Sequence, residues 1–154
     1  MSFNSQDINL MQRACLLCDN SSLDVRTGCV FVSSEGVVIG EGHNKIAKGG
    51  HALSRDISEQ SDVVEQESGM PPIIHAEIAA LNQAKQKGVS IKGATVYVTR
   101  FPCMDCAKKL VGEGVVQIFY MSDHFTSGNE AMPVFKEAGV SVTQIPEDVV
   151  WGRA

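Results

Sequence analysis

Apolar residues recur at helical spacing near the start of the chain. Positions i, i+3, i+7 and i+10 of one apolar stripe are occupied by Ile8, Met11, Cys15 and Cys18. This spacing places them on one helix face, so we predict a helix over residues 7–19 that packs that face against a core. Asp7 can cap the first turn through its carboxylate, and the polar stretch 19–24 ends the helix.

The pattern then changes to short apolar runs. Gly28–Ser33 and Val37–Glu41 are predicted strands, and the polar turn at 34–36 joins them into a hairpin. Residues 42–73 show no sustained period and carry many polar groups, which predicts a long loop. Loops of this length in compact domains often carry function.

From residue 75 onward, helical and strand patterns alternate. The predicted helices are His75–Lys87, Cys103–Glu113 and Pro133–Ala138. The predicted strands are Ala94–Thr99, Val116–Met121 and Val140–Ile145. Strand–helix–strand units require parallel strands joined by right-handed crossovers. Together with the hairpin, this order predicts an α/β fold of three layers (α/β/α), with a mixed five-stranded sheet between helices.

The length and composition fit one domain spanning residues 1–154. The chain is 44% hydrophobic and 20% charged, which is an ordinary globular balance. No apolar run approaches the roughly 20 residues that a membrane-spanning helix needs. Residues 1–7 also lack the basic and apolar regions of a secretory signal. We therefore expect a cytoplasmic protein without a membrane partner.

The net charge and the cysteine content restrict which binding partners and which cysteine chemistry are expected. The formal net charge is −5, whereas nucleic-acid surfaces are built from Lys and Arg clusters, so we expect no large surface of that kind. The number of cysteines is five, which is odd. In a reducing compartment, closely spaced cysteines are better explained by metal binding than by disulfides.

One histidine and two cysteines form the pattern of a metal site. Cys103 and Cys106 are separated by two residues at a predicted helix start, so both thiolates can bind one ion. His75 starts the preceding predicted helix, and prolines precede both helix starts, so the two N-termini can converge. Three protein ligands leave the fourth tetrahedral position open for water, which is typical of a catalytic zinc site.

Glu77 lies two residues after His75, where it can reach the water of such a site without being a ligand. A bound zinc ion lowers the pKa of its water to about 7. A neighbouring carboxylate can move protons while that water attacks a polarised carbon. The sequence therefore predicts a hydrolytic metal centre, whereas an isolated glutamate at a helix start would be read as a surface group.

A second Cys-x-x-Cys pair, Cys15 and Cys18, lies on the apolar face of the first predicted helix. Cysteines at such positions usually pack as small apolar side chains, and we favour that interpretation. The alternative is a four-cysteine structural zinc site shared with Cys103 and Cys106. That site would leave His75 without a role.

The segments 75–77 (His-Ala-Glu) and 102–106 (Pro-Cys-Met-Asp-Cys) resemble those of the zinc-dependent nucleoside and nucleotide deaminases. The resemblance covers most of the chain, from about residue 10 to residue 146. It implies a cytidine-deaminase-like fold with a bound Zn²⁺. It assigns zinc binding to His75, Cys103 and Cys106, and proton transfer to Glu77.

Within that family the chain looks most like the deoxycytidylate (dCMP) deaminases. The similar stretches are Phe101–Lys108, Met121–Asp123 and Ala138–Val140. The long segment between residues 44 and 75 also fits them, whereas the tRNA adenosine deaminases usually have a short one. The Gly-Cys-Ser-Asp motif linked to nucleotide regulation in many dCMP deaminases is replaced here by Gly49–Ala52, so the resemblance does not extend to that motif.

The resemblance also suggests substrate contacts. Residues 42–44 (Gly-His-Asn) are similar to a Gly-Tyr-Asn element whose asparagine binds the sugar, which suggests this role for Asn44, although a plain turn is the alternative. Ala76 and Pro102, inside the two motifs, are expected beside the substrate. The candidates for a phosphate contact, each of which could instead be a solvated surface charge, are Arg26, Lys45, Arg55 and Arg100.

These observations favour zinc-dependent hydrolytic deamination of a cytosine nucleotide, with dCMP converted to dUMP. The resemblance implies a homo-oligomer, because family members commonly form dimers or larger rings. Deamination of guanine, adenosine or a tRNA adenosine is the alternative within the same chemistry. A zinc-binding module without catalysis is the alternative from another class.

Overall fold

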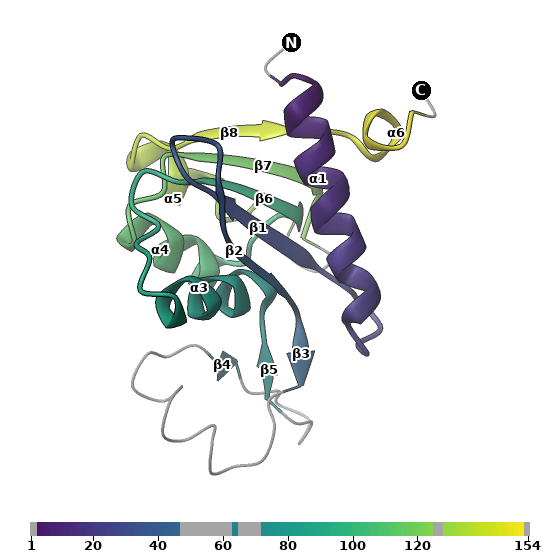
Figure 1. Cartoon of the computed structure of the whole chain (residues 1–154), viewed down its shortest axis with the longest axis horizontal. Helices are drawn as coiled ribbons and strands as arrows, with labels where there is room; N and C mark the ends of the chain where they lie inside the picture. Colours follow the sequence, from purple (N-terminus) through teal and green to yellow (C-terminus); the bar gives the residue numbers. More distant parts are fainter. Residues whose placement is uncertain (1–2, 47–62, 65–71, 125–127, 153–154) are drawn as a thin grey trace.

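The computed structural model describes residues 3–46, 63–64, 72–124 and 128–152 (Figure 1). Its main elements in chain order are α1 (Ser5–Leu17), η1 (Cys18–Asn20), β1 (Gly28–Val32), β2 (Val38–His43), β3 (Lys45–Ile46), β4 (Val63–Val64), β5 (Ile73–Ile74), α3 (Ala76–Gln86), β6 (Thr95–Arg100), α4 (Met104–Gly112), β7 (Gln117–Ser122), α5 (Met132–Glu137), β8 (Ser141–Gln144) and α6 (Glu147–Val150).

The central sheet has five strands in the order β2-β1-β6-β7-β8. β1 pairs antiparallel with β2 and with β6, whereas β6, β7 and β8 run parallel to one another. The crossovers between the parallel strands are made by α4 and α5. The mixed five-stranded sheet predicted from the sequence is therefore confirmed.

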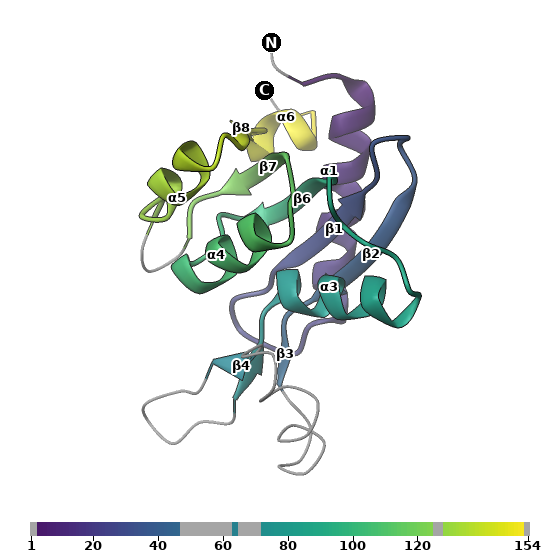
Figure 2. The same ribbon diagram turned by 90° about the vertical axis from the view of Figure 1, so that its left-hand side faces the viewer.

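Helices cover both faces of this sheet, which gives the three predicted layers (Figures 1 and 2). On one face, α1 and α6 pack against side chains such as Val30, Tyr97 and Phe119. On the other face, α3, α4 and α5 pack against Phe31 and Val98 among others. Alternate strand residues point to opposite faces, so the two cores share the same strands. No helix in the described ranges is both long and apolar enough to span a membrane.

The start of α1 differs from the prediction. The helix begins at Ser5 and its cap is Asn4, whose side chain accepts a hydrogen bond from the backbone N–H of Asp7. Asp7 in turn accepts from the backbone N–H of Asn4, so the two form a reciprocal capping box. The carboxylate of Asp7 also accepts a 2.6 Å hydrogen bond from the Tyr97 hydroxyl. Both residue types suit the cap position, and only the backbone decides between them.

The prediction of a loop over residues 42–73 is wrong at its described ends. β2 continues to His43, and β3, β5 and β4 form a second sheet of three short strands in that order. Strands of two residues are too short to show a period of two in the sequence, which is why they were not predicted. The rest of that predicted loop lies outside the described residues, as do Arg55 and Gly49–Ala52.

Helix α3 lies unusually close to strand β2 because two glycines of β2 face it. A Cβ atom at Gly40 would lie 2.6 Å from the carbonyl oxygen of Ala80, and one at Gly42 would lie 2.4 Å from the backbone nitrogen of Ala80. Any larger residue at either position would therefore push the helix away from the sheet. This close packing sets the distance between α3 and the sheet, and Glu77 lies in the first turn of that helix.

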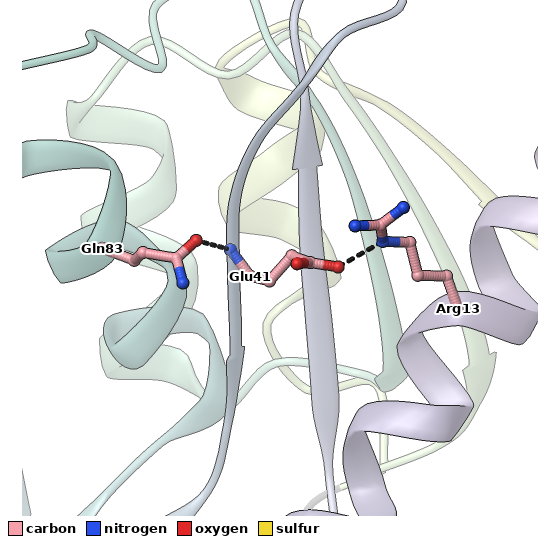
Figure 3. Close-up of polar contacts among 3 residues, drawn as sticks. All are labelled: Arg13, Glu41 and Gln83. Atoms are coloured by element: carbon pink, nitrogen blue, oxygen red, sulfur yellow. Dashed lines mark hydrogen bonds and ion pairs between the residues drawn. The ribbon is translucent and has the colours of Figure 1, made fainter. Parts of the chain in front are cut away.

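Polar contacts add to this attachment at the edge of the sheet (Figure 3). The side-chain carbonyl of Gln83 on α3 accepts a 2.9 Å hydrogen bond from the backbone N–H of Glu41 on β2. The Glu41 carboxylate forms an ion pair with Arg13 of α1. The edge strand β2 is thereby joined to one helix from each layer.

Candidate metal and substrate site

Two helix N-termini place the three predicted metal ligands. His75 is the N-cap residue of α3 and Cys103 is the N-cap residue of α4, and both have extended backbones. Neither side chain forms the usual capping hydrogen bond to its own helix, so both can turn toward each other. Cys106 lies in the first turn of α4 and is 2% exposed.

The ligand atoms of these residues converge. The Nδ1 atom of His75 lies 3.2 Å from Sγ of Cys106 and 3.5 Å from Sγ of Cys103. All three ligand atoms lie within 4.8 Å of one another. Ligands of a tetrahedral Zn²⁺ ion are separated by roughly 3.5–3.8 Å, given the usual Zn–N and Zn–S bond lengths. The donor set and its spacing therefore fit zinc.

The proton affinities of the two thiols show how tightly they are coupled. A hydrogen bond from Cys106 is the main cause that lowers the pKa of Cys103 to about 3, with His75 adding to it. The same hydrogen bond, followed by burial, raises the pKa of Cys106. Burial lowers the pKa of His75, but its hydrogen bond to Cys103 and the nearby negative charges outweigh burial and raise it.

Glu77 is enclosed beside this group. Its side chain is 4% exposed, which is rare for a glutamate in a protein core. Burial raises its pKa to about 7, although the neighbouring His75 acts in the opposite direction. The carboxyl group is therefore held where water is excluded, next to the ligands and not among them.

A cavity of about 280 Å³ opens above these residues. Its floor includes His75, Cys103 and Glu77, and its lining contains two more of the predicted site residues, Asn44 and Ala76. The size is at the lower limit of small-molecule sites.

Of the other residues predicted to contact the substrate, some line this cavity and others do not. Arg100 lines it, whereas Arg26, Lys45 and Pro102 are not among its described lining residues. Pro102 is buried next to Cys103, and Lys45 lines a separate hollow together with residues of β2 and α3.

Comparison with known proteins identifies the family. Residues 4–122 match the family model described as the cytidine and deoxycytidylate deaminase zinc-binding region, which is more than half of the chain. The chain belongs to this deaminase family. Zinc is the metal of the family, in agreement with the donor set formed by His75, Cys103 and Cys106.

Individual relatives match parts of the chain. It is 39% identical over 75 residues to ComE operon protein 2 of Bacillus subtilis, covering 49% of this chain and 39% of that protein. It is 30% identical over 121 residues to human deoxycytidylate deaminase, covering 75% of this chain and 65% of that protein. The chain thus spans less than two thirds of the length of either relative.

A solved structure shows the same fold. The dCMP deaminase of cyanophage S-TIM5, in complex with dCMP and dUMP, superimposes with a TM-score of 0.74 and 23% identity. The match covers 94% of this chain and all of the phage chain. The cytidine-deaminase-like architecture expected from the sequence is thereby confirmed.

Asn44 forms hydrogen bonds that stabilise the wall of the cavity. Its side-chain amide donates a 2.6 Å hydrogen bond to the carbonyl of Val25, and its side-chain oxygen accepts a 3.0 Å bond from the N–H of Thr27. Its own backbone N–H bonds to the Thr27 carbonyl at 3.1 Å. Val25 and Thr27 also line the cavity, so Asn44 both lines the cavity and holds two of its other lining residues in place.

Some lining residues were not singled out from the sequence. They are Leu23, Asp24, Val25, Thr27, Ile73 and His124, of which His124 follows β7. The signal for His124 is its position after a strand, because the carboxyl ends of the parallel strands β6 and β7 meet at one edge of the sheet. Segment 23–27 carries no comparable sequence signal.

Cys15 and Cys18 lie apart from the metal group. Sγ of Cys15 is 3.7 Å from the sulfur of Met121, and Sγ of Cys18 is 3.6 Å from the hydroxyl of Thr99. Among the described residues, the candidate metal group contains only His75, Cys103 and Cys106. The packing interpretation of Cys15 is supported by its place beside the core under α1.

Proposed function

We propose that this chain is a zinc-dependent hydrolase that deaminates a cytosine nucleotide, with dCMP converted to dUMP and ammonia released. The observation that carries the proposal is the buried Glu77 carboxyl, which shares one cavity with the ligands His75 and Cys103. The names of its relatives, including human deoxycytidylate deaminase, support the choice of dCMP.

In this proposal His75, Cys103 and Cys106 hold the metal. When bound, zinc supplies a water molecule whose pKa is lowered to about 7, so that attack on the ring carbon C4 occurs at neutral pH. Cys103 lies at the N-terminus of α4, where the positive end of the helix dipole favours its thiolate form.

Glu77 moves the protons. Its carboxylate accepts a proton from the attacking water, donates it to ring nitrogen N3, and passes a second proton to the departing amino group. General acid–base transfer of this kind contributes about two to four orders of magnitude in rate. Burial keeps bulk water from competing for the carboxyl group.

Other residues orient the nucleoside. The Asn44 side chain uses one amide hydrogen and one oxygen lone pair in hydrogen bonds to the cavity wall. Its second amide hydrogen and second lone pair can bond to a sugar hydroxyl. Phe101 forms a wall that is fixed by edge-on contacts with Tyr120 and Phe135 at 4.8 and 5.9 Å between ring centres. We place Ala76 beside the base and Pro102 behind Cys103, as a support.

A substrate panel tests this function. The zinc-loaded protein is incubated with dCMP, CMP, deoxycytidine, cytosine, guanine and adenosine, and ammonia release is measured for each. We expect dCMP to have the highest kcat/KM. A higher value for guanine or adenosine would assign another base, and absence of turnover on all six in a zinc-loaded, folded protein would favour a binding module.

Compartment and assembly belong to the same proposal. All five cysteines are free thiols, which supports a reducing, cytoplasmic location. We propose a homo-oligomer, as the family resemblance implies, and Leu16 and Trp151 are exposed apolar side chains available for contact between copies. Light scattering coupled to size-exclusion chromatography measures the oligomeric state directly.

A further inference from the structure

The cavity has one strongly basic side chain. Of the lysines and arginines in the described part of the chain, Arg100 alone lines it. Arg26 is exposed, and its Nε donates to the carbonyl of Leu23. Lys45 faces the separate hollow near α3. Among the basic residues that the sequence offered as phosphate contacts, the structure therefore favours Arg100.

Arg100 forms no ion pair with another residue in the described part of the chain. It is the last residue of β6, and one of its terminal nitrogens donates to the backbone carbonyl of Asp123 at 3.3 Å. Its Nε is buried and has no hydrogen-bond partner. The ion pairs formed between described residues join Arg13 to Glu41 and Lys85 to Glu113, and do not include Arg100. A guanidinium group with unused donors beside a cavity is suited to an anion.

His124 lies on the same side of the cavity as Arg100. Strands β6 and β7 run parallel with Arg100 opposite Ser122, so the residues that follow each strand are neighbours. His124 also lines the cavity. Burial is the main cause that lowers the pKa of His124, although the nearby charge of Cys103 acts in the opposite direction. Arg100 supplies a positive charge to the cavity lining, and the imidazole of His124 supplies a second polar group.

The acidic lining residues restrict where an anion can lie. Asp24 and Glu77 are the carboxylates among the described lining residues. A substrate anion is repelled by both and attracted by Arg100. A nucleotide with its base over the metal ligands therefore gains most when its anionic end lies at the ends of β6 and β7.

We propose that Arg100, assisted by His124, binds the phosphate of the nucleotide and makes the cavity selective for a nucleoside monophosphate over the nucleoside. The substrate class rests on the proposed deaminase function. Arg100 is then a specificity-determining residue whose charge is balanced by the bound phosphate.

The test compares two substrates in matched variants. For Arg100→Gln we expect kcat/KM for dCMP to fall by at least about tenfold, because a charge-assisted hydrogen bond is lost, while kcat/KM for deoxycytidine changes less than about twofold. Lys92→Gln removes an equal charge from an exposed position outside the cavity lining, and should change neither value. An equal loss on both substrates, or no loss on dCMP, overturns the proposal.

Product binding provides a second readout that does not depend on turnover. Calorimetry measures dUMP and deoxyuridine with the wild-type protein and with Arg100→Gln, Arg100→Lys and His124→Gln. We expect dUMP affinity to fall at least about tenfold in Arg100→Gln and roughly two- to tenfold in His124→Gln, with Arg100→Lys retaining part of it.

These readouts separate the two proposals. If Arg100→Gln does not fold, Arg100→Lys and His124→Gln decide, and unchanged dUMP affinity in both overturns the inference. If the wild-type protein binds dUMP through Arg100 but deaminates no cytosine compound, the proposed function fails and the phosphate site stands. If it deaminates dCMP and Arg100→Gln keeps the full preference over deoxycytidine, the phosphate site fails and the function stands.

Discussion

The Nδ1 atom of His75 lies 3.2 Å from Sγ of Cys106, although 31 positions separate the two residues in the chain. The contact joins the first turns of α3 and α4, which pack on the same face of the sheet. His75 and Cys106 meet because the chain that enters α3 and the chain that enters α4 both end their preceding strands at the same part of the structure. The metal group is therefore a product of the packing of two helices against one sheet.

The first prediction concerns the ligands. Cys106→Ala is expected to lose most of the bound zinc and to melt at a lower temperature, because metal binding and folding are coupled. Zinc is quantified on the purified protein by atomic absorption. Cys29→Ala is the matched control, since Cys29 is equally buried but is not a member of the ligand group, and it should keep one zinc per chain. Full zinc content in Cys106→Ala would refute the ligand assignment.

The second prediction concerns Glu77. Glu77→Gln keeps the shape of the side chain and removes its ability to exchange protons. We expect an unchanged zinc content and a fall in kcat of about two to four orders of magnitude. The comparison is made by ammonia release and metal analysis on the same preparation. A zinc-loaded variant with nearly normal kcat would remove Glu77 from proton transfer.

The third prediction concerns the close contact between β2 and α3. Gly42→Ala places a Cβ atom 2.4 Å from the backbone nitrogen of Ala80, and backbone cannot rotate away as a side chain can. We expect a loss of about 1–3 kcal/mol in the free energy of unfolding, measured by urea denaturation. Displacement of α3 should also lower kcat, because Glu77 moves with the helix.

Gly112→Ala is the control for that substitution. Gly112 is the last residue of α4, and a Cβ atom there would meet no heavy atom within 4 Å. Alanine should therefore be neutral or stabilise by up to about 1 kcal/mol through its helix propensity. Equal destabilisation by both alanines would show that the contact with Ala80 does not limit the packing.

The fourth prediction concerns alkaline pH. Burial, followed by the nearby charges of Cys18, Glu147 and Asp19, raises the pKa of Cys15 to about 12 from an ordinary value of 9.0. The unfolded thiol ionises first, so this stabilisation is complete below pH 9 and is lost as the pH rises from 9 to 12. The slope is at most about 1.4 kcal/mol per pH unit, and solvent screening reduces it because the group is partly exposed.

Urea denaturation at pH 7 and pH 10.5 measures that slope. The wild-type protein should lose more of its unfolding free energy between the two conditions than Cys15→Ala does. Burial also raises the pKa of Tyr97, Cys18 and Cys29, so an alkaline loss remains in the variant. Equal losses in both proteins would show that Cys15 ionises no later in the folded state than in the unfolded one.

The helices and strands of the central fold were largely predictable, because each is long enough to show its period. The predicted Val116–Met121 and the observed Gln117–Ser122 differ by one residue at each end. Two-residue strands such as Lys45–Ile46 were missed, since a strand so short has no period to detect. The cap of α1 was misassigned because Asn4 and Asp7 both suit that position, and the chain uses them together.

The sequence by itself determined the chemistry: which residues can bind a metal, which carboxyl group lies beside it, and the order of helices and strands. Residue type and local spacing carry that information. Only the tertiary structure decided which basic residue lines the cavity beside the candidate metal group, since Arg26, Lys45 and Arg100 look alike along the chain. Their placement depends on strand register and on the edge where parallel strands end, and these are set by contacts between residues far apart in the sequence.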